Sequence, residues 1–339
     1  MIRKTAVIGL GAIGSMVGAY LSRAGRDVTL ISCFRQDNAA YLTEHGIDVD
    51  GVNGAFHAPV RAVYIDDIPA EEQFDLFVVA LKGNDTEQAL RKLAPHLRPE
   101  GCCLSLQNGI NEDLIASIVG WDRTVYALSR AGGSVTAPGR LWDHEGVFRI
   151  GERGDGRTPR IEELREHLSC VRPTEISDDI LRDKWDKLCA VCMSVPVCTV
   201  SGMYLGDVFF DEKAQRLFAW LALEIFRVTE ASGHPLTRIL DRERDEWSDI
   251  ASGRISGALD RETSDIRFPP GVVDAYTMDI RKGRPLEIQF TNGAVTRIGR
   301  ENNVPTPVND SLIAAVLDIE AGKRSASPRL LEELICEAA

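Results

Sequence analysis

The stretch KTAVIGLGAIGSMVGAYLSRAG, residues 4–25, decides the fold class of this 339-residue chain. Residues 4–9 form a short apolar run that is typical of a buried strand, and residues 12–24 have the pattern of a helix that Gly25 ends. The loop between them follows the pattern G-x-G-x-x-G and consists of Gly9, Leu10, Gly11, Ala12, Ile13 and Gly14. In this setting the pattern is typical of dinucleotide binding, because the glycines let a pyrophosphate approach the N–H groups at the start of the helix.

Strand and helix patterns keep alternating along the first part of the chain. Apolar runs predict strands at residues 27–32, 74–81, 102–106 and 124–128, and helical patterns cover residues 86–97, 112–118 and 160–168. This alternation is typical of a doubly wound parallel sheet, so we expect an α/β fold whose N-terminal part is of the Rossmann type. Two further segments, residues 139–142 and 147–151, are predicted to form a hairpin added to that sheet.

A change of pattern near residues 173–178 marks the expected domain boundary. We predict a dinucleotide-binding Rossmann domain over residues 1–175 and an all-helical domain over residues 176–339 for substrate binding and dimerisation. Helical patterns in the second part cover residues 181–200, 211–232, 236–253, 278–282, 287–303 and 309–322. Asn309 is expected to be the N-cap of the last of these helices.

Composition excludes several classes of partner. The formal net charge is −12, whereas nucleic acids and anionic membranes require a basic face. No apolar run reaches the ~20 residues of a membrane span, so we expect a cytoplasmic protein. Cys189 and Cys192 have the C-x-x-C spacing, but no second pair completes a zinc site. We therefore interpret both as core residues of a helix and predict no metal.

The residues after the second predicted strand indicate which dinucleotide binds. An NAD site usually has an acidic residue there that accepts hydrogen bonds from the ribose 2′-hydroxyl. This chain has Ser32 and Arg35 in that region, so nothing there repels a 2′-phosphate and two side chains are able to bind one. NADP is therefore favoured over NAD, with a solvated surface role as the alternative for Arg35.

Polar clusters follow two other predicted strands. Lys82 comes directly after Leu81 at the end of one apolar run, and Asn108 follows the next run within Gln-Asn-Gly. Because ligands of open α/β sheets bind at the carboxyl ends of the strands, these residues are candidate cofactor or substrate contacts. A third cluster, Lys184-Trp-Asp-Lys187-Leu, opens the first predicted helix of the second domain.

In this order the motifs resemble the ketopantoate reductase (2-dehydropantoate 2-reductase) family along essentially the whole chain. The resemblance rests on G-x-G-A-x-G, a strand ending in Leu-Lys, Gln-Asn-Gly, Trp-x-Lys-Leu, and Leu-Glu-Ile near residue 287. It implies NADPH-dependent reduction of a small carbonyl substrate in a cleft between a Rossmann domain and a helical domain. It also implies that Lys187 protonates the carbonyl oxygen, that Glu287 holds and polarises the substrate, and that Lys82 and Asn108 lie on the cofactor side. Lys184 is then the candidate for an ordinary helix-surface lysine.

Four positions depart from the family pattern. The family carries asparagines four and eight residues after its catalytic lysine and an Asn-x-x-Ser arrangement before its glutamate. Here these positions hold Val191, Val195, Val272 and Ala275. An apolar wall tolerates bulk but gives up hydrogen bonds to a hydroxylated substrate, so we expect an altered, more apolar pocket, as for an aryl or alkyl ketone or 2-oxo acid. Ser194, Tyr276 and Thr277 are alternative sources of polar groups.

Several functions therefore remain open. The leading hypothesis is an NADP-dependent oxidoreductase that reduces a 2-oxo acid or ketone other than ketopantoate. The alternatives are ketopantoate reductase itself working through a rearranged pocket, an opine-type dehydrogenase that reduces an imine, and a regulator that binds NADP without turnover. Retention of both Lys187 and Glu287 counts against the regulator.

Overall fold

The structure is a computed structural model that describes residues 1–154, 156–259 and 271–338. By its internal contacts the chain divides into two compact units, Met1–Asp183 and Lys184–Ala339. The assignment of nucleotide binding to residues 1–175 and of substrate binding to residues 176–339 stays a prediction. No helix in the described part of the chain is long and apolar enough to cross a membrane.

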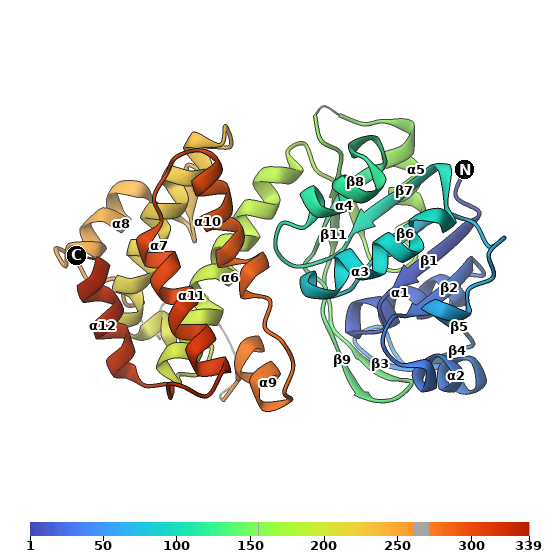
Figure 1. The fold of residues 1–339 in the computed structure, drawn as a ribbon, viewed down its shortest axis with the longest axis horizontal. Coiled ribbons are helices and arrows are strands. Elements are labelled where there is room, and N and C mark those ends of the chain that lie inside the picture. The colour runs from blue at the N-terminus through green and yellow to red at the C-terminus, as the bar shows by residue number, and fades with distance from the viewer. Residues whose placement is uncertain (155, 260–270, 339) are drawn as a thin grey trace. The chain divides into compact units, whose positions relative to one another are not determined.

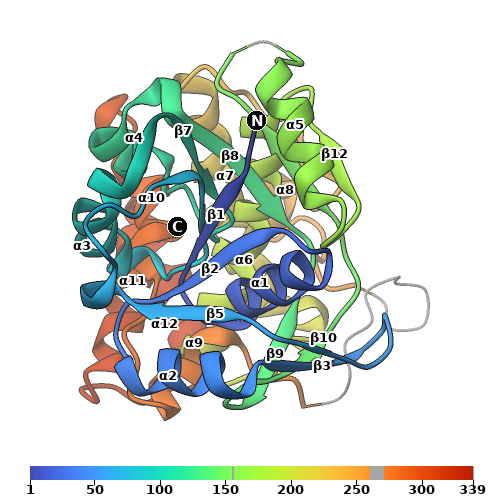
Figure 2. The same ribbon diagram turned by 90° about the vertical axis from the view of Figure 1, so that its right-hand side faces the viewer.

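The N-terminal unit is built on a sheet that has eight strands within its described residues (Figures 1 and 2). Its order is β12-β11-β8-β7-β6-β1-β2-β5, and every pairing is parallel except that of β8 with β11. The strands are β1 (Lys4–Ile8), β2 (Asp27–Ser32), β5 (Arg61–Tyr64), β6 (Phe74–Val79), β7 (Leu97–Ser105), β8 (Thr124–Ser129), β11 (Phe148–Gly151) and β12 (Thr174–Ile176). The strand order reverses at β1, between β6 and β2, which is the point where open α/β sheets bind ligands.

Helices cover both faces of this sheet because its strands are apolar on both sides. On one face, Ile8 of β1 and Phe77 of β6 belong to a core cluster with α3 (Gly83–Leu93) and α4 (Glu112–Val119). On the other face, Val7 and Val78 pack in a cluster with α1 (Ala12–Arg23), α2 (Gln36–His45) and α5 (Pro159–Leu168). Successive strand residues thus enter opposite cores, and the predicted Rossmann-type fold is confirmed.

A second, smaller sheet covers α1 from the side that faces away from the first sheet. Its order is β4-β3-β10-β9, formed by β3 (Ile47–Gly51), β4 (Phe56–Ala58), β9 (Gly133–Ala137) and β10 (Arg140–Asp143). Helix α1 contacts strands of both sheets, which explains why Gly14 to Leu21 are all buried. Asp143 of β10 forms a buried ion pair with Arg172 and accepts a hydrogen bond from Tyr20 of α1 at 2.7 Å.

The predicted hairpin of residues 139–142 and 147–151 is wrong. Strand β10 pairs with β3 and β9 in the small sheet, whereas β11 lies between β8 and β12 in the large one. The physical reason is that β10 buries only one face, which holds Leu141 and the ion-paired Asp143, while every residue of β11 is buried or half-buried between two neighbouring strands. Local alternation shows that a strand exists, but it does not select the partner strand.

In its described residues the C-terminal unit is helical, apart from a hairpin of two short strands, β13 (Arg238–Ile239) and β14 (Arg242–Glu243) (Figure 1). Its helices within the described residues are α6 (Ile180–Ser201), α7 (Glu212–Ala231), α8 (Arg244–Ala251), α9 (Ala275–Arg281), α10 (Asn292–Glu301), α11 (Pro307–Glu320) and α12 (Pro328–Ala338). Long apolar helices pack here as predicted, and Cys189 and Cys192 are buried core residues of α6.

The predicted N-cap of α11 is wrong. The helix begins at Pro307 with Thr306 as its N-cap, and Asn309 lies within the first turn. A proline at the first helical position is favoured because its φ angle is already helical and its missing N–H is not needed there. The N–H groups of Val308 and Asn309 donate instead to the buried Glu224 carboxylate of α7, at 2.8 and 3.0 Å. The capping acceptor thus comes from another helix, which local sequence does not reveal.

Candidate functional site

The glycine loop lies between β1 and α1, at the point where the strand order of the sheet reverses. A Cβ atom at Gly14 would lie 1.8 Å from the Gly9 carbonyl oxygen, and Gly9 itself has a φ of +102°. A Cβ at Gly11, by contrast, would meet nothing within 4 Å. Two glycines therefore close the turn against its own backbone, and the third leaves the backbone open to an approaching group.

The N-terminus of α1 suits a phosphate. The first N–H groups of any helix lack partners within the helix, and here Gly11 is the N-cap, no side chain caps the helix, and the first turn holds no acidic residue. These features leave backbone donors and a partial positive charge for an anion. The loop geometry therefore fits the dinucleotide that its sequence predicts.

At the end of β2, both residues expected to bind a 2′-phosphate already have partners within the protein. The hydroxyl of Ser32 is buried and donates to the Arg35 carbonyl oxygen at 2.7 Å. The Arg35 guanidinium is exposed and forms an ion pair of 2.6 Å with Asp37, in the first turn of α2. Arg35 holds the pKa of the Asp37 carboxyl below its usual value. Ser32 thus shapes the turn, and a 2′-phosphate would compete with Asp37 for Arg35.

Lys82 and Asn108 lie on neighbouring loops, after β6 and β7. Lys82 is the N-cap of α3, and its carbonyl accepts a hydrogen bond from the Thr86 hydroxyl at 3.0 Å. Asn108 is exposed, and its carbonyl accepts the amide of Asn111 at 2.7 Å. Both loops are therefore fixed through their backbones, since other side chains hold the carbonyls of the two candidate residues.

Gln107 connects the two loops. Its side-chain amide is buried and donates to the Leu81 carbonyl at 2.9 Å and to the Thr86 hydroxyl at 2.7 Å. The sequence places Gln107 in the Gln-Asn-Gly cluster but does not pair it with Thr86. The one signal in the sequence was a glutamine just after a buried strand, a place where a long amide side chain is able to bond a neighbouring loop.

Helix α6 presents a stripe of half-buried residues at spacings of four in a largely buried segment. Lys187, Val191 and Val195 are half-buried, while their neighbours Leu188, Cys192 and Met193 are buried. Spacings of four residues place side chains on the same face of a helix. The stripe thus offers one amine followed by two aliphatic side chains. The expectation that Lys184 lies on the surface is wrong, since it is only 4% exposed.

Glu287 is half-buried and lies directly before a short turn of helix that leads into α10. Its backbone carbonyl accepts the N–H of Phe290 at 2.8 Å. Val272, which occupies one of the departing positions, is half-buried, and Ala275, at another, is exposed at the start of α9. The two aliphatic positions are therefore accessible, as a substrate wall requires.

Ser194, Tyr276 and Thr277 are the alternative sources of polar groups for the substrate pocket, and the hydroxyls of the first two have hydrogen-bond partners in the C-terminal unit. The Ser194 hydroxyl donates to the Ala190 carbonyl of its own helix at 2.7 Å. The Tyr276 hydroxyl is buried and lies 2.5 Å from the Thr291 hydroxyl, and burial raises the pKa of Tyr276. Thr277 is half-buried, and its backbone N–H donates to Asp274.

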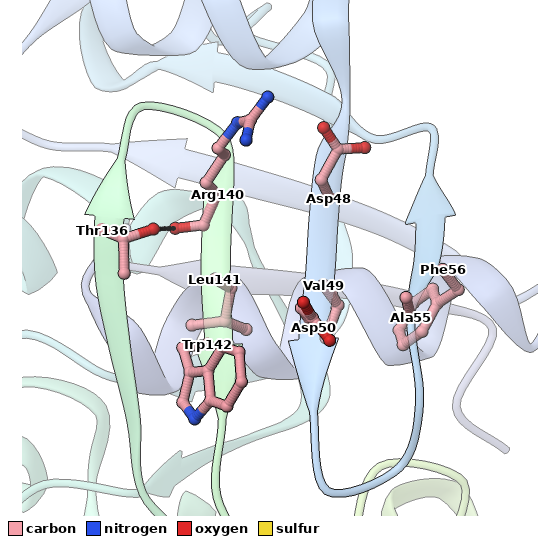
Figure 3. A pocket seen from close by; sticks show the side chains of 9 residues that line it. All are labelled: Asp48, Val49, Asp50, Ala55, Phe56, Thr136, Arg140, Leu141 and Trp142. Atoms are coloured by element: carbon pink, nitrogen blue, oxygen red, sulfur yellow. Dashed lines mark hydrogen bonds between the residues drawn. The ribbon is translucent and has the colours of Figure 1, made fainter.

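A separate hollow of about 420 Å³ lies on the small sheet of the N-terminal unit. Figure 3 shows Arg140 and Trp142 of β10 beside Asp48 and Asp50 of β3, with Phe56 on β4. None of the candidate cofactor or catalytic residues lines it. The chemistry expected from the sequence is therefore not located in this hollow.

The fold is that of a Rossmann-type α/β unit followed by a helical unit. Two family models match the chain. "Ketopantoate reductase PanE/ApbA" covers residues 5–154, and "Ketopantoate reductase PanE/ApbA C terminal" covers residues 179–320. The chain belongs to the ketopantoate reductase family and is an oxidoreductase that acts on the CH–OH/carbonyl couple.

Curated relatives and solved structures agree with this membership. A 2-dehydropantoate 2-reductase of Pyrococcus abyssi is 32% identical over 90% of this chain and 94% of its own length. One of Mesorhizobium japonicum is 27% identical, over 94% and 99%. A D-mandelate dehydrogenase, solved with NADH and anilino(oxo)acetate, shares the fold with a TM-score of 0.79 at 24% identity, over 94% of this chain and 98% of that one.

Proposed function

We propose that the protein uses NADPH to reduce the carbonyl of a small 2-oxo acid or ketone whose side chain is more apolar than that of ketopantoate. One observation carries the proposal: the half-buried stripe on α6 is a lysine followed by two valines. Membership of the ketopantoate reductase family supports the reaction type and the cofactor. The valines replace asparagines of the family pattern and so favour an apolar substrate wall.

The N-terminal unit would hold the cofactor through backbone groups and a few side chains. The pyrophosphate would lie over Gly9, Leu10, Gly11, Ala12, Ile13 and Gly14, at the uncapped N-terminus of α1. Arg35 would bind the 2′-phosphate, with Ser32 shaping the turn, and Leu81, Lys82 and Asn108 would border the cofactor on the neighbouring loops. When bound, the reduced nicotinamide supplies hydride to the carbonyl carbon.

The C-terminal unit would supply the proton. The Lys187 ammonium would donate a proton to the carbonyl oxygen as the C–H bond forms, and it would then be reprotonated from solvent. Before transfer, its positive charge would stabilise the negative charge that develops on that oxygen. Glu287 would orient the substrate beside Lys187, and Val191 and Val195 would contact the substrate's apolar side chain.

A panel of carbonyl substrates, followed by the loss of NADPH absorbance, tests this function. The panel contains ketopantoate, straight-chain 2-oxo acids, phenylglyoxylate and simple ketones, each with NADPH and with NADH. We expect kcat/KM for phenylglyoxylate or a straight-chain 2-oxo acid to exceed that for ketopantoate. Faster reduction of ketopantoate would instead identify a ketopantoate reductase, and reduction only with an added amine would identify an imine-reducing enzyme.

Lys187→Ala tests the proton donor. We expect kcat to fall by about 100-fold or more, the usual contribution of a positioned acid, while the Kd of NADPH is unchanged. The matched control is Lys213→Ala, because Lys213 is an exposed lysine of the same unit that pairs with Glu332. Full activity of Lys187→Ala would reject the assignment of the acid.

A further inference from the structure

Pro196 lies inside α6 and interrupts its ladder of backbone hydrogen bonds. A proline in a helix has no N–H group, so the carbonyl four residues earlier loses its donor. In α6 that carbonyl belongs to Cys192, which is completely buried. The side-chain amide of Asn292, at the start of α10, donates to this oxygen at 3.0 Å. Asn292 thus supplies the donor that Pro196 lacks.

Asn292 is itself held from two other helices. Its amide also donates to the Asn309 side-chain oxygen of α11 at 2.9 Å, and the Asn309 amide donates to Glu224 of α7 at 2.8 Å. All three side chains are buried. The network runs from α7 through α11 and α10 to the interior of α6. Because each bond fixes the orientation of the next group, the amide of Asn292 is held toward Cys192.

The hydrogen bond between Asn292 and the Cys192 carbonyl lies close in sequence to the two candidate catalytic residues. Cys192 lies five residues after Lys187 on α6, and Asn292 lies five residues after Glu287. The bond therefore joins the helix that carries the candidate proton donor to the segment that carries the candidate substrate-binding glutamate. Both segments belong to the C-terminal unit.

We propose that Asn292 is a positioning residue for carbonyl reduction. By replacing the backbone donor that Pro196 removes, it fixes Lys187 relative to Glu287. The inference rests on the proposed function, because it takes these two residues as the groups that act on the substrate. A displacement of about 1 Å between such groups lowers the rate by about 100-fold, so one buried bond between their segments has a large effect on turnover.

The experiment is a double-mutant cycle of Asn292→Ala and Pro196→Ala, read by kcat, by the pH profile of kcat/KM and by the Kd of NADPH. Asn292→Ala is expected to lower kcat by about 10- to 100-fold and to move the pH profile, with the Kd of NADPH within about twofold of wild type. Pro196→Ala restores an N–H group opposite the Cys192 carbonyl. In that background, Asn292→Ala is expected to lower kcat several-fold less.

Asn302→Ala is the matched control. Asn302 is the C-cap of α10, and its side-chain amide also donates to a helix carbonyl, that of Ile298, at 2.9 Å. It is expected to leave kcat and the pH profile unchanged. If Asn292→Ala does not fold, Asn292→Leu has a similar size, carries no donor, buries no charge and is read in the same way. Equal losses of kcat in both backgrounds, or a folded Asn292 variant with unchanged kcat and pH profile, would overturn the inference.

The two proposals fail in different ways. A wild-type enzyme that reduces no carbonyl rejects the proposed function and this inference with it. An active wild type whose Asn292 variants keep their kcat and pH profile rejects the inference alone.

Discussion

The side-chain amide of Gln107 lies 2.7 Å from the hydroxyl of Thr86, and this hydrogen bond joins α3, whose N-cap is Lys82, to the loop that carries Asn108. Thr86 in turn donates to the carbonyl of Lys82 at 3.0 Å. The backbone segments that carry the two candidate cofactor residues are therefore held together by hydrogen bonds of Gln107 and Thr86. Neither Gln107 nor Thr86 needs to touch the cofactor to affect its binding.

Gln107→Glu is expected to weaken NADPH binding. The carboxylate keeps the shape of the side chain but lacks the amide donor, so the buried Leu81 carbonyl loses its partner at a cost of about 1–3 kcal/mol, and the buried charge adds to that cost. The Kd of NADPH, measured by fluorescence titration, should rise by about 10-fold. Gln73→Glu is the control, because Gln73 makes a similar bond to the Pro95 carbonyl on the surface. An unchanged Kd for Gln107→Glu would show that the hydrogen bonds of Gln107 do not affect cofactor binding.

Asp37→Asn is expected to strengthen NADPH binding relative to NADH. Asp37 pairs with Arg35 on the surface, and such exposed pairs contribute about 0–1 kcal/mol, so removing the competitor should raise NADPH affinity by at most about fivefold. Arg35→Ala should reduce the preference for NADPH, and the effect of both variants should shrink at high salt. Titrations with both cofactors at two ionic strengths measure this. A preference for NADPH that neither variant alters would remove Arg35 from the 2′-phosphate site.

The double variant Val191→Asn/Val195→Asn is expected to shift substrate preference toward ketopantoate. It restores the amides of the family pattern on the partly exposed stripe of α6, where they are able to bond a hydroxylated substrate. The ratio of kcat/KM for ketopantoate to that for phenylglyoxylate should rise by about 10-fold or more. Ala190→Asn is the control, since Ala190 is also half-buried on α6 but lies beside the stripe. An unchanged ratio would place substrate selection elsewhere.

His167 is expected to make the fold less stable in mild acid. It is buried on α5, where its ring lies 3.0 Å from the Thr5 hydroxyl. Burial, and then the nearby Arg26 charge, lower its pKa from 6.5 to about 4. Between about pH 6.5 and pH 4, His167 is therefore protonated in the unfolded chain but neutral in the folded protein. Above pH 6.5 it does not lower the free energy of unfolding, and as the pH decreases to 4 it lowers that free energy by up to about 3 kcal/mol.

Denaturant unfolding of wild type and His167→Gln between pH 4 and 7.5 checks this expectation. The variant should lose part of the pH dependence of the unfolding free energy over that window. His45→Gln serves as the control, because His45 is exposed at the end of α2. Parallel stability curves for wild type and His167→Gln would contradict the role of His167.

Local sequence was sufficient for much of the fold. The alternation of apolar runs with helical patterns predicted the parallel sheet, because a doubly covered strand and an amphipathic helix each have their own period. The same patterns did not identify the small sheet, since β3, β4 and β9 are short and half-exposed. They also paired residues 139–142 with 147–151, because nearness in sequence is a poor guide when a chain crosses between two sheets.

The sequence by itself determined the glycine loop after β1, the family, and the residue types of the candidate site, including Lys187 and the aliphatic positions that follow it. These depend on residue identity and spacing along one strand, loop or helix. The tertiary structure decided what holds them in place. Gln107 reaches Thr86 across two loops, and Asn292 reaches the carbonyl that Pro196 leaves open from a distance of 100 residues. Such contacts follow from how elements pack in three dimensions, and no local period encodes them.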